Sequence, residues 1–92
     1  LSDPAADLAV AAALVSALAD KPLPLRAIWF GEVSLSGEIR PVAHGGLRVR
    51  EAAKLGFERG YGPSELDGAS SKLQYGGLTQ LANLVDRIMG GA

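Results

Sequence analysis

Basic side chains gather in the middle of the sequence, where their spacing could serve to bind phosphate groups. Guanidinium and ammonium groups contact nucleic-acid phosphates whatever the base sequence. The candidates for DNA contact are Arg48, Arg50 and Lys54, with Arg40 and Arg59 as flanking members. Because Glu51 and Glu58 lie among them, a solvated helix face of mixed charge is the competing interpretation. Both interpretations stay open at the level of sequence.

The other side chains that could do chemistry lack suitable partners. His44 is the only histidine and there is no cysteine, so no metal-ligand cluster and no base with an orienting group is visible. We interpret His44 as an exposed loop histidine. Glu32 and Glu38 could form a carboxylate pair, although single charges on strand faces are commoner. Gly45-Gly46 lacks the lysine and hydroxyl residue of a phosphate-binding loop. We therefore predict no cofactor and no metal in this chain.

The composition indicates one small domain spanning residues 1–92. The chain has 92 residues, 48% of them hydrophobic, and a formal net charge of -1, so no strong attraction to nucleic acid or membrane follows from the total charge. Asp3, Asp7 and Ser16 interrupt the apolar start, which is shorter than the roughly 18 residues of a spanning helix. The absence of cysteine is compatible with the cytosol, and we predict a cytoplasmic location. Because the chain opens on a helix cap without methionine, we expect it to be a fragment of a longer protein.

The elements that would position these groups centre on residues 31–47. Alternating apolar residues predict two strands that pair about a two-residue turn at Ser36-Gly37. The apolar positions are Val33 and Leu35 in the first strand and Ile39 and Val42 in the second. Pro41 has no N–H to donate, so the second strand should lie at an edge or stop there.

Three helices and further strands surround this hairpin. Asp3 and Pro4 predict a helix that runs to about Ala19. It is apolar on most faces, which requires cover from a missing layer or a partner. A second helix is predicted from about Leu47 to Leu55, ended by Gly56. The apolar stripe of a last helix is Leu78, Leu81, Ala82, Val85, Ile88 and Met89. Residues 27–30 are predicted to begin the first strand of the hairpin. Further short strands are predicted at residues 59–61 and 73–75, with a polar loop over 64–71. This order predicts an α/β sandwich of two layers.

Three motifs of the chain carry a resemblance to a known family. They are the helix start PAADLA at residues 4–9, the hairpin GEVSLSGEIRPV at 31–42 with the following GGL, and the helix REAAKLGF at 50–57. In the same order and spacing, they resemble the Lon-like C-terminal domain of the bacterial RadA (Sms) family. The resemblance covers residues 1–62 well and the tail more loosely. It implies the ribosomal protein S5 domain 2-like fold of Lon-type peptidase domains, with the N-terminal strands missing here.

The resemblance also implies that the peptidase dyad is degenerate. Lon-type peptidases use a serine nucleophile that a lysine base activates. The nucleophile position falls on Ala5, which has no hydroxyl, and the lysine position falls on Arg48 or within one residue of it. Arginine stays protonated and cannot serve as a base. We therefore expect no catalytic residue in this chain.

The resemblance implies a role within a larger protein. Members of the family are ATP-hydrolysing DNA repair enzymes that act in recombination and branch migration, with ATP, magnesium and zinc held outside this domain. The domain would then be a non-catalytic scaffold that packs subunits into a homo-oligomeric ring, expected to be a hexamer. One alternative is a Lon-type ATP-dependent serine-lysine peptidase domain, which the missing dyad disfavours. Another is an S5-like domain with an RNA or ribosomal role, for which the chain lacks a basic excess.

Overall fold

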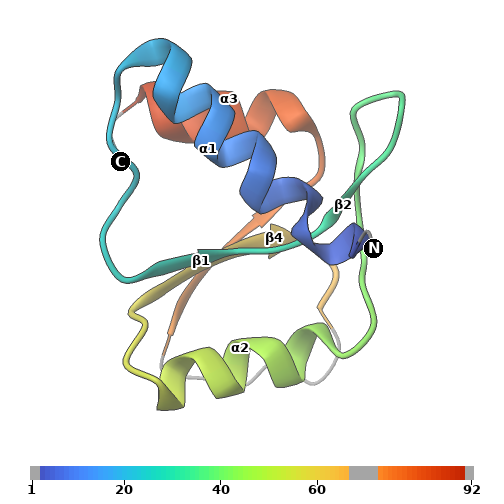
Figure 1. Cartoon of the computed structure of the whole chain (residues 1–92). Helices are drawn as coiled ribbons and strands as arrows, with labels where there is room; N and C mark the ends of the chain where they lie inside the picture. The colour runs from blue at the N-terminus through green and yellow to red at the C-terminus, as the bar shows by residue number, and fades with distance from the viewer. Residues whose placement is uncertain (1–2, 67–72, 91–92) are drawn as a thin grey trace.

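A computed structural model describes residues 3–66 and 73–90 (Figure 1). Within this part of the chain, the elements in order are η1 (Pro4–Ala6), α1 (Asp7–Ala19), β1 (Ala27–Trp29), β2 (Glu32–Val33), β3 (Ile39–Arg40), α2 (Gly45–Lys54), β4 (Arg59–Pro63), β5 (Gln74–Leu78) and α3 (Leu81–Met89). Of the predicted loop over 64–71, residues 67–71 lie outside the described residues. None of the described helices is both long and apolar enough to cross a bilayer.

Among the described residues, the main sheet has three parallel strands in the order β1-β4-β5. Helices α1 and α3 lie on one face of this sheet and α2 lies on the other (Figure 1). The α/β class is confirmed, but the prediction of two layers is wrong, since helices cover both faces. The cause is the parallel pairing of β1 with β4, because parallel neighbours need a crossover connection, and this one carries α2.

Each face of the sheet has its own hydrophobic core. On the side of α1 and α3, Leu8 and Leu84 pack with Tyr61 of β4. On the side of α2, Val49 packs with Phe30 and Leu73. Neighbouring residues of β1 point to opposite faces, so Trp29 contacts the first core and Ile28 the second. Both sides of the small sheet are therefore buried.

The hairpin differs from its prediction in its turn and its strand ends. β2 and β3 form a separate antiparallel sheet, with Val33 opposite Ile39. The Ser34 N–H donates to the Glu38 carbonyl over 2.9 Å, and the loop residues are Leu35, Ser36 and Gly37. The predicted two-residue turn is thus wrong. Gly37 adopts φ +85°, as a three-residue loop with a terminal left-handed residue requires.

The ends of the hairpin strands follow from that turn. Leu35 belongs to the loop and is fully exposed, so it does not extend the buried face of the first strand. β3 ends at Arg40, immediately before Pro41, as the missing proline N–H predicted. Val42 therefore lies outside the strand, where it packs against the core beneath α2.

Helix boundaries are confirmed at several residues and corrected at others. The Asp3 carboxylate accepts from the Ala5 N–H over 3.1 Å and caps the first turn, which is a 3-10 helix. α2 begins at Gly45 and not at Leu47, because His44 takes a left-handed conformation with φ 58° and places both glycines in the first turn. Gly56 follows α2 with φ +96°, which confirms it as the helix-ending glycine.

The last helix is shorter and rotated relative to its prediction. Leu78 is the final residue of β5, so the helix starts only at Leu81. Its buried side chains are Leu84 and Ile88, whereas Val85 and Met89 are exposed, contrary to the predicted stripe. The predicted stripe counts helical positions from Leu78, which lies in β5. The predicted buried face is therefore rotated by part of a turn from the observed one. The helix does end at Met89, as predicted.

Candidate functional site

The three candidate DNA contacts share one exposed helix, α2, and differ in their partners. The Lys54 ammonium lies 3.6 Å from a Glu51 carboxylate oxygen, one turn away on the same helix. The Arg48 guanidinium donates from Nε to the Ala43 carbonyl over 3.5 Å. Arg50 makes no ion pair with any carboxylate in the described part of the chain. The mixed-charge interpretation therefore fits Lys54, whereas Arg50 offers a guanidinium that is open to a phosphate.

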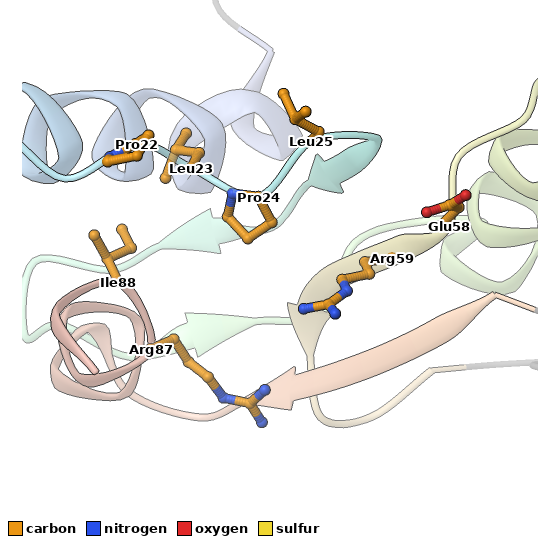
Figure 2. A pocket seen from close by; sticks show the side chains of 8 residues that line it. All are labelled: Pro22, Leu23, Pro24, Leu25, Glu58, Arg59, Arg87 and Ile88. Atoms are coloured by element: carbon orange, nitrogen blue, oxygen red, sulfur yellow. The ribbon is translucent and has the colours of Figure 1, made fainter. Parts of the chain in front are cut away.

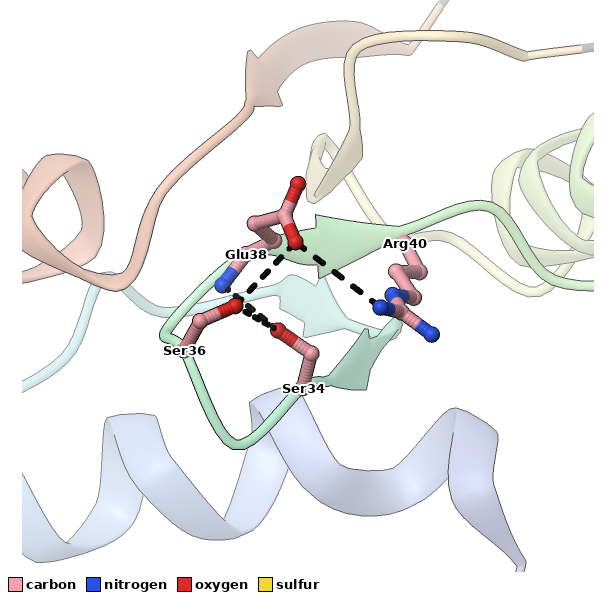
Figure 3. Close-up of polar contacts among 4 residues, drawn as sticks. All are labelled: Ser34, Ser36, Glu38 and Arg40. Carbon is pink, nitrogen blue, oxygen red and sulfur yellow. Dashed lines mark hydrogen bonds and ion pairs between the residues drawn. The ribbon is translucent and has the colours of Figure 1, made fainter.

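Arg40 belongs to a polar cluster on the hairpin and not to the α2 surface (Figure 3). Its guanidinium lies 3.8 Å from the Glu38 carboxylate. The Ser36 hydroxyl donates to the same carboxylate over 3.1 Å, and the Ser34 hydroxyl lies 3.1 Å from that of Ser36. Glu38 is thus engaged within the hairpin. The considered carboxylate pair is not formed, since no described contact joins Glu38 to Glu32.

The positions of the expected dyad lie in two separate elements. Ala5 sits in η1 and is only 6% exposed. Its carbonyl accepts a hydrogen bond from the Gly31 N–H over 2.8 Å. Arg48 is exposed on α2, and no described hydrogen bond or ion pair joins it to Ala5. At these two positions the chain carries a methyl group and a guanidinium, which offer neither a nucleophile nor a base.

His44 stands at the start of α2 and is exposed, as predicted. It is the N-cap residue of the helix, but its side chain makes no capping hydrogen bond. Within the described ranges, 3–66 and 73–90, no group of three histidine or carboxylate side chains could hold a metal ion. The geometry gives His44 a role in turning the backbone into the helix.

Two arginines that the sequence did not connect face one cavity of about 460 Å³ (Figure 2). Arg59 comes from the start of β4 and Arg87 from the last turn of α3. The cavity walls also include the connector 22–25 and Ile88. The sequence predicts Arg59 only as a flanking member of the α2 cluster. The sequence offers no signal for Arg87, because no local spacing links α3 to β4.

Comparison with known proteins finds relatives for part of the chain. No protein-family model matches it. The DNA repair protein RadA of Rickettsia felis is 56% identical over 59 residues, which are 64% of this chain and 13% of that protein. The RadA proteins of Brucella abortus and Escherichia coli are 53% and 52% identical over 64 residues, 70% of this chain and 14% of each relative. The chain therefore spans only about 13% of the length of the curated relatives it matches. Over the matched residues the chain is homologous to the bacterial DNA repair protein RadA, as its hairpin and helix motifs predicted.

Proposed function

We propose that this chain is a Lon-like domain of the S5 domain 2-like fold, and that it serves a RadA-type protein as a non-catalytic scaffold for subunit assembly. The homology to RadA supports the assignment of this chain to a RadA-type protein. Ala5 and Arg48, at the positions where a peptidase needs serine and lysine, support the lack of peptidase activity. The alternative is an active serine-lysine peptidase domain. It would need a hydroxyl and an unprotonated amine at positions that offer neither.

The observation that carries the scaffold role is the outer face of α1. Val10 and Leu14 are each 58% exposed and Leu18 is 87% exposed. These residues are four apart, so they line one stripe of the helix. The sequence has no charged residue between Asp7 and Asp20. Contiguous exposed apolar surface on a small domain usually marks an interface.

The whole protein would then be a DNA-dependent ATPase of DNA repair, recombination and branch migration. Its ATP, magnesium and zinc would be bound by parts outside this chain. Its subunits would form a homo-oligomeric ring, expected to be a hexamer, in the cytoplasm. A ring of head-to-tail subunits needs two different patches per subunit. The α1 stripe would supply one of the two.

A second candidate role is contact with DNA through α2. The exposed Arg50, with Arg48 and Lys54 on the same helix, supports this role. Phosphate contacts of this kind add affinity without adding base specificity. This role and the scaffold role use different faces of the sheet, because α1 and α2 lie on opposite sides (Figure 1). One subunit could therefore perform both.

The experiment that tests the scaffold role measures self-association of the full-length protein. Sedimentation velocity over a concentration series should show an oligomer for the parent and a shift to smaller species for Leu14→Asp. The matched control is Leu35→Asp, which places the same charge on the exposed hairpin loop and should leave association unchanged. A monomeric parent, or equal association of Leu14→Asp and parent, would contradict the scaffold role.

Upstream residues of the same subunit could instead cover α1, and a further measurement separates that case. If residues of the same subunit cover α1, Leu14→Asp should lower the thermal midpoint of the full-length protein without changing the mass of the assembly. Covering between subunits makes the same variant lower the mass, and the midpoint then depends on protein concentration.

A further inference from the structure

We propose that the cavity between residues 22–25, the start of β4 and the last turn of α3 binds an acidic side chain of a polypeptide segment whose neighbouring residues are aliphatic. Nothing in the roles above uses this cavity. It lies on the α1–α3 side of the sheet, away from the basic residues of α2. The proposal depends on two arginines, on the anchoring of one of them, and on the apolar wall that faces them.

Both guanidinium groups are directed into the same space from opposite sides (Figure 2). Neither Arg59 nor Arg87 forms an ion pair with a carboxylate among the described residues. Among the described residues that line the cavity, the acidic one is Glu58, whose carboxylate lies 3.7 Å from the Arg26 guanidinium and is engaged there. Two like charges that face one cavity repel each other, and a bound anion between them removes the repulsion. The charge of the cavity therefore favours an anionic ligand.

Arg87 is held in place before any ligand arrives. Its guanidinium carbon lies 5.7 Å from the centroid of the Tyr61 ring, in a cation–π arrangement. Tyr61 in turn stacks on Trp29, with ring centroids 4.2 Å apart and planes 17° from parallel. Gly76 leaves room for the guanidinium, since a Cβ atom at that residue would lie 3.1 Å from Arg87 Nη1. A fixed planar guanidinium suits bidentate recognition of a carboxylate, and it loses little entropy on binding.

The remaining wall is aliphatic. Its described residues are Pro22, Leu23, Pro24 and Leu25 from the connector, with Ile88 from α3. No aromatic ring lines the cavity among its described residues, so a nucleobase would find no stacking surface there. An aliphatic wall beside two guanidinium groups instead matches a carboxylate with apolar neighbours. This combination favours a protein ligand over nucleic acid.

The test titrates the 92-residue chain with two matched peptides and follows backbone amide signals by NMR. The probe is N-acetyl-Leu-Glu-Leu-amide, whose only charge is the glutamate carboxylate, and its control is N-acetyl-Leu-Gln-Leu-amide. We expect saturable shifts at the amides of Leu23, Arg59 and Ile88 with the glutamate peptide. The glutamine peptide should bind at least fivefold more weakly. Equal shifts with both peptides, or no saturable shift with either, would overturn the proposal.

Variants assign the effect to the two arginines. Arg59→Gln and Arg87→Gln should each weaken the glutamate peptide at least fivefold, whereas Arg50→Gln, at an exposed arginine of α2, should leave binding unchanged. Dispersed spectra of each variant establish that it is folded. Arg59→Gln leaves the Tyr61 contact intact, so its result stands even if Arg87→Gln perturbs the core. Retained affinity in Arg59→Gln contradicts the proposal. Tighter binding of inorganic phosphate or of a ten-residue oligothymidylate at the same amides would contradict the assigned ligand.

Discussion

The Gly31 N–H donates to the Ala5 carbonyl oxygen over 2.8 Å, and the Gly31 carbonyl accepts from the Leu8 N–H over 3.0 Å. These two hydrogen bonds fix the start of the first helical segment against the end of β1. They require an unusual backbone at Gly31, whose φ is +148°. The same kink separates β1 from β2, so one residue sets both the helix docking and the change from one sheet to the other.

We therefore predict that Gly31→Ala destabilises the domain by about 2–3 kcal/mol, because a side chain at that φ is strained. Its Cβ atom would also lie 3.2 Å from Ile39 Cγ2. The matched control is Gly56→Ala, at φ +96° with no atom within 4 Å of the added Cβ, which should cost about 1 kcal/mol. Urea unfolding of both variants checks the difference. A smaller loss for Gly31→Ala than for Gly56→Ala would contradict the docking role.

The corrected orientation of α3 makes a second prediction. Leu84 is fully buried, while Val85 beside it is 37% exposed. Leu84→Ala should cost about 2–5 kcal/mol because it leaves a cavity in the core. Val85→Ala should cost less than about 1 kcal/mol, since much of its side chain is already hydrated. Thermal and urea unfolding of both variants measure these losses of stability. A larger loss for Val85→Ala than for Leu84→Ala would support the buried stripe predicted from the sequence.

Local signals in the sequence predicted those features that depend on a few neighbouring residues. Asp3 and Pro4 gave the start of the first helix, Pro41 the end of the hairpin, and Gly56 the end of α2. Each acts through its own backbone geometry or hydrogen-bonding groups. Arg50 and Lys54 are exposed on α2, as both the DNA-contact and the mixed-charge interpretations of the sequence require.

Pairing between distant segments was not predictable in the same way. The apolar residues 27–30 lead directly into the hairpin and predict one continuous strand, yet the chain divides at Gly31 between two sheets. Contacts between distant segments determine that β1 and β5 both pair in parallel with β4. The same contacts determine the number of layers. Arg59 and Arg87 likewise come together only through the tertiary fold, which brings β4 and α3 close to each other.

Tyr75 makes a prediction about pH. Its hydroxyl donates to the Pro63 carbonyl over 2.6 Å, and burial raises the pKa of this phenol above its ordinary value of 10.0. At neutral pH, Tyr75→Phe should lose about 1 kcal/mol of stability, the usual net value of one hydrogen bond. Above about pH 10 the unfolded parent ionises first and binds fewer protons than the folded parent, so the parent's stability falls as pH rises.

Phenylalanine cannot ionise, so the stability advantage of the parent over Tyr75→Phe should shrink and then change sign between about pH 10 and pH 11.5. Urea midpoints of both proteins at several pH values in this window measure the gap. Groups that titrate in both proteins contribute equally to the two stabilities, so their effects cancel in the difference. A gap that stays constant or widens over this window would show that the phenol is not protected from ionisation in the fold.

The dyad positions predict that the full-length protein does not hydrolyse peptides, with or without ATP. Ala5→Ser should also be inactive, because Arg48 cannot accept the proton of the new hydroxyl. Unfolded casein and a fluorogenic peptide are suitable substrates. Turnover that disappears with an inhibitor of serine-lysine dyads, in either protein, would support the peptidase alternative.

The proposed DNA contact predicts unequal effects along α2. Arg50→Gln should weaken binding of the full-length protein to duplex DNA more than Lys54→Gln, because the Lys54 ammonium already has Glu51 at 3.6 Å. Glu51→Gln should strengthen binding, since it frees Lys54 and removes a negative charge next to the phosphates.

Fluorescence anisotropy over a range of salt concentrations gives both the affinity and the salt slope. The slope should become shallower by about 0.9 for each phosphate that a variant no longer neutralises. Arg26→Gln, at an arginine paired with Glu58 outside α2, is the control and should change neither quantity. Equal binding by Arg50→Gln, Glu51→Gln and parent at every salt concentration would exclude α2 as the surface that meets DNA.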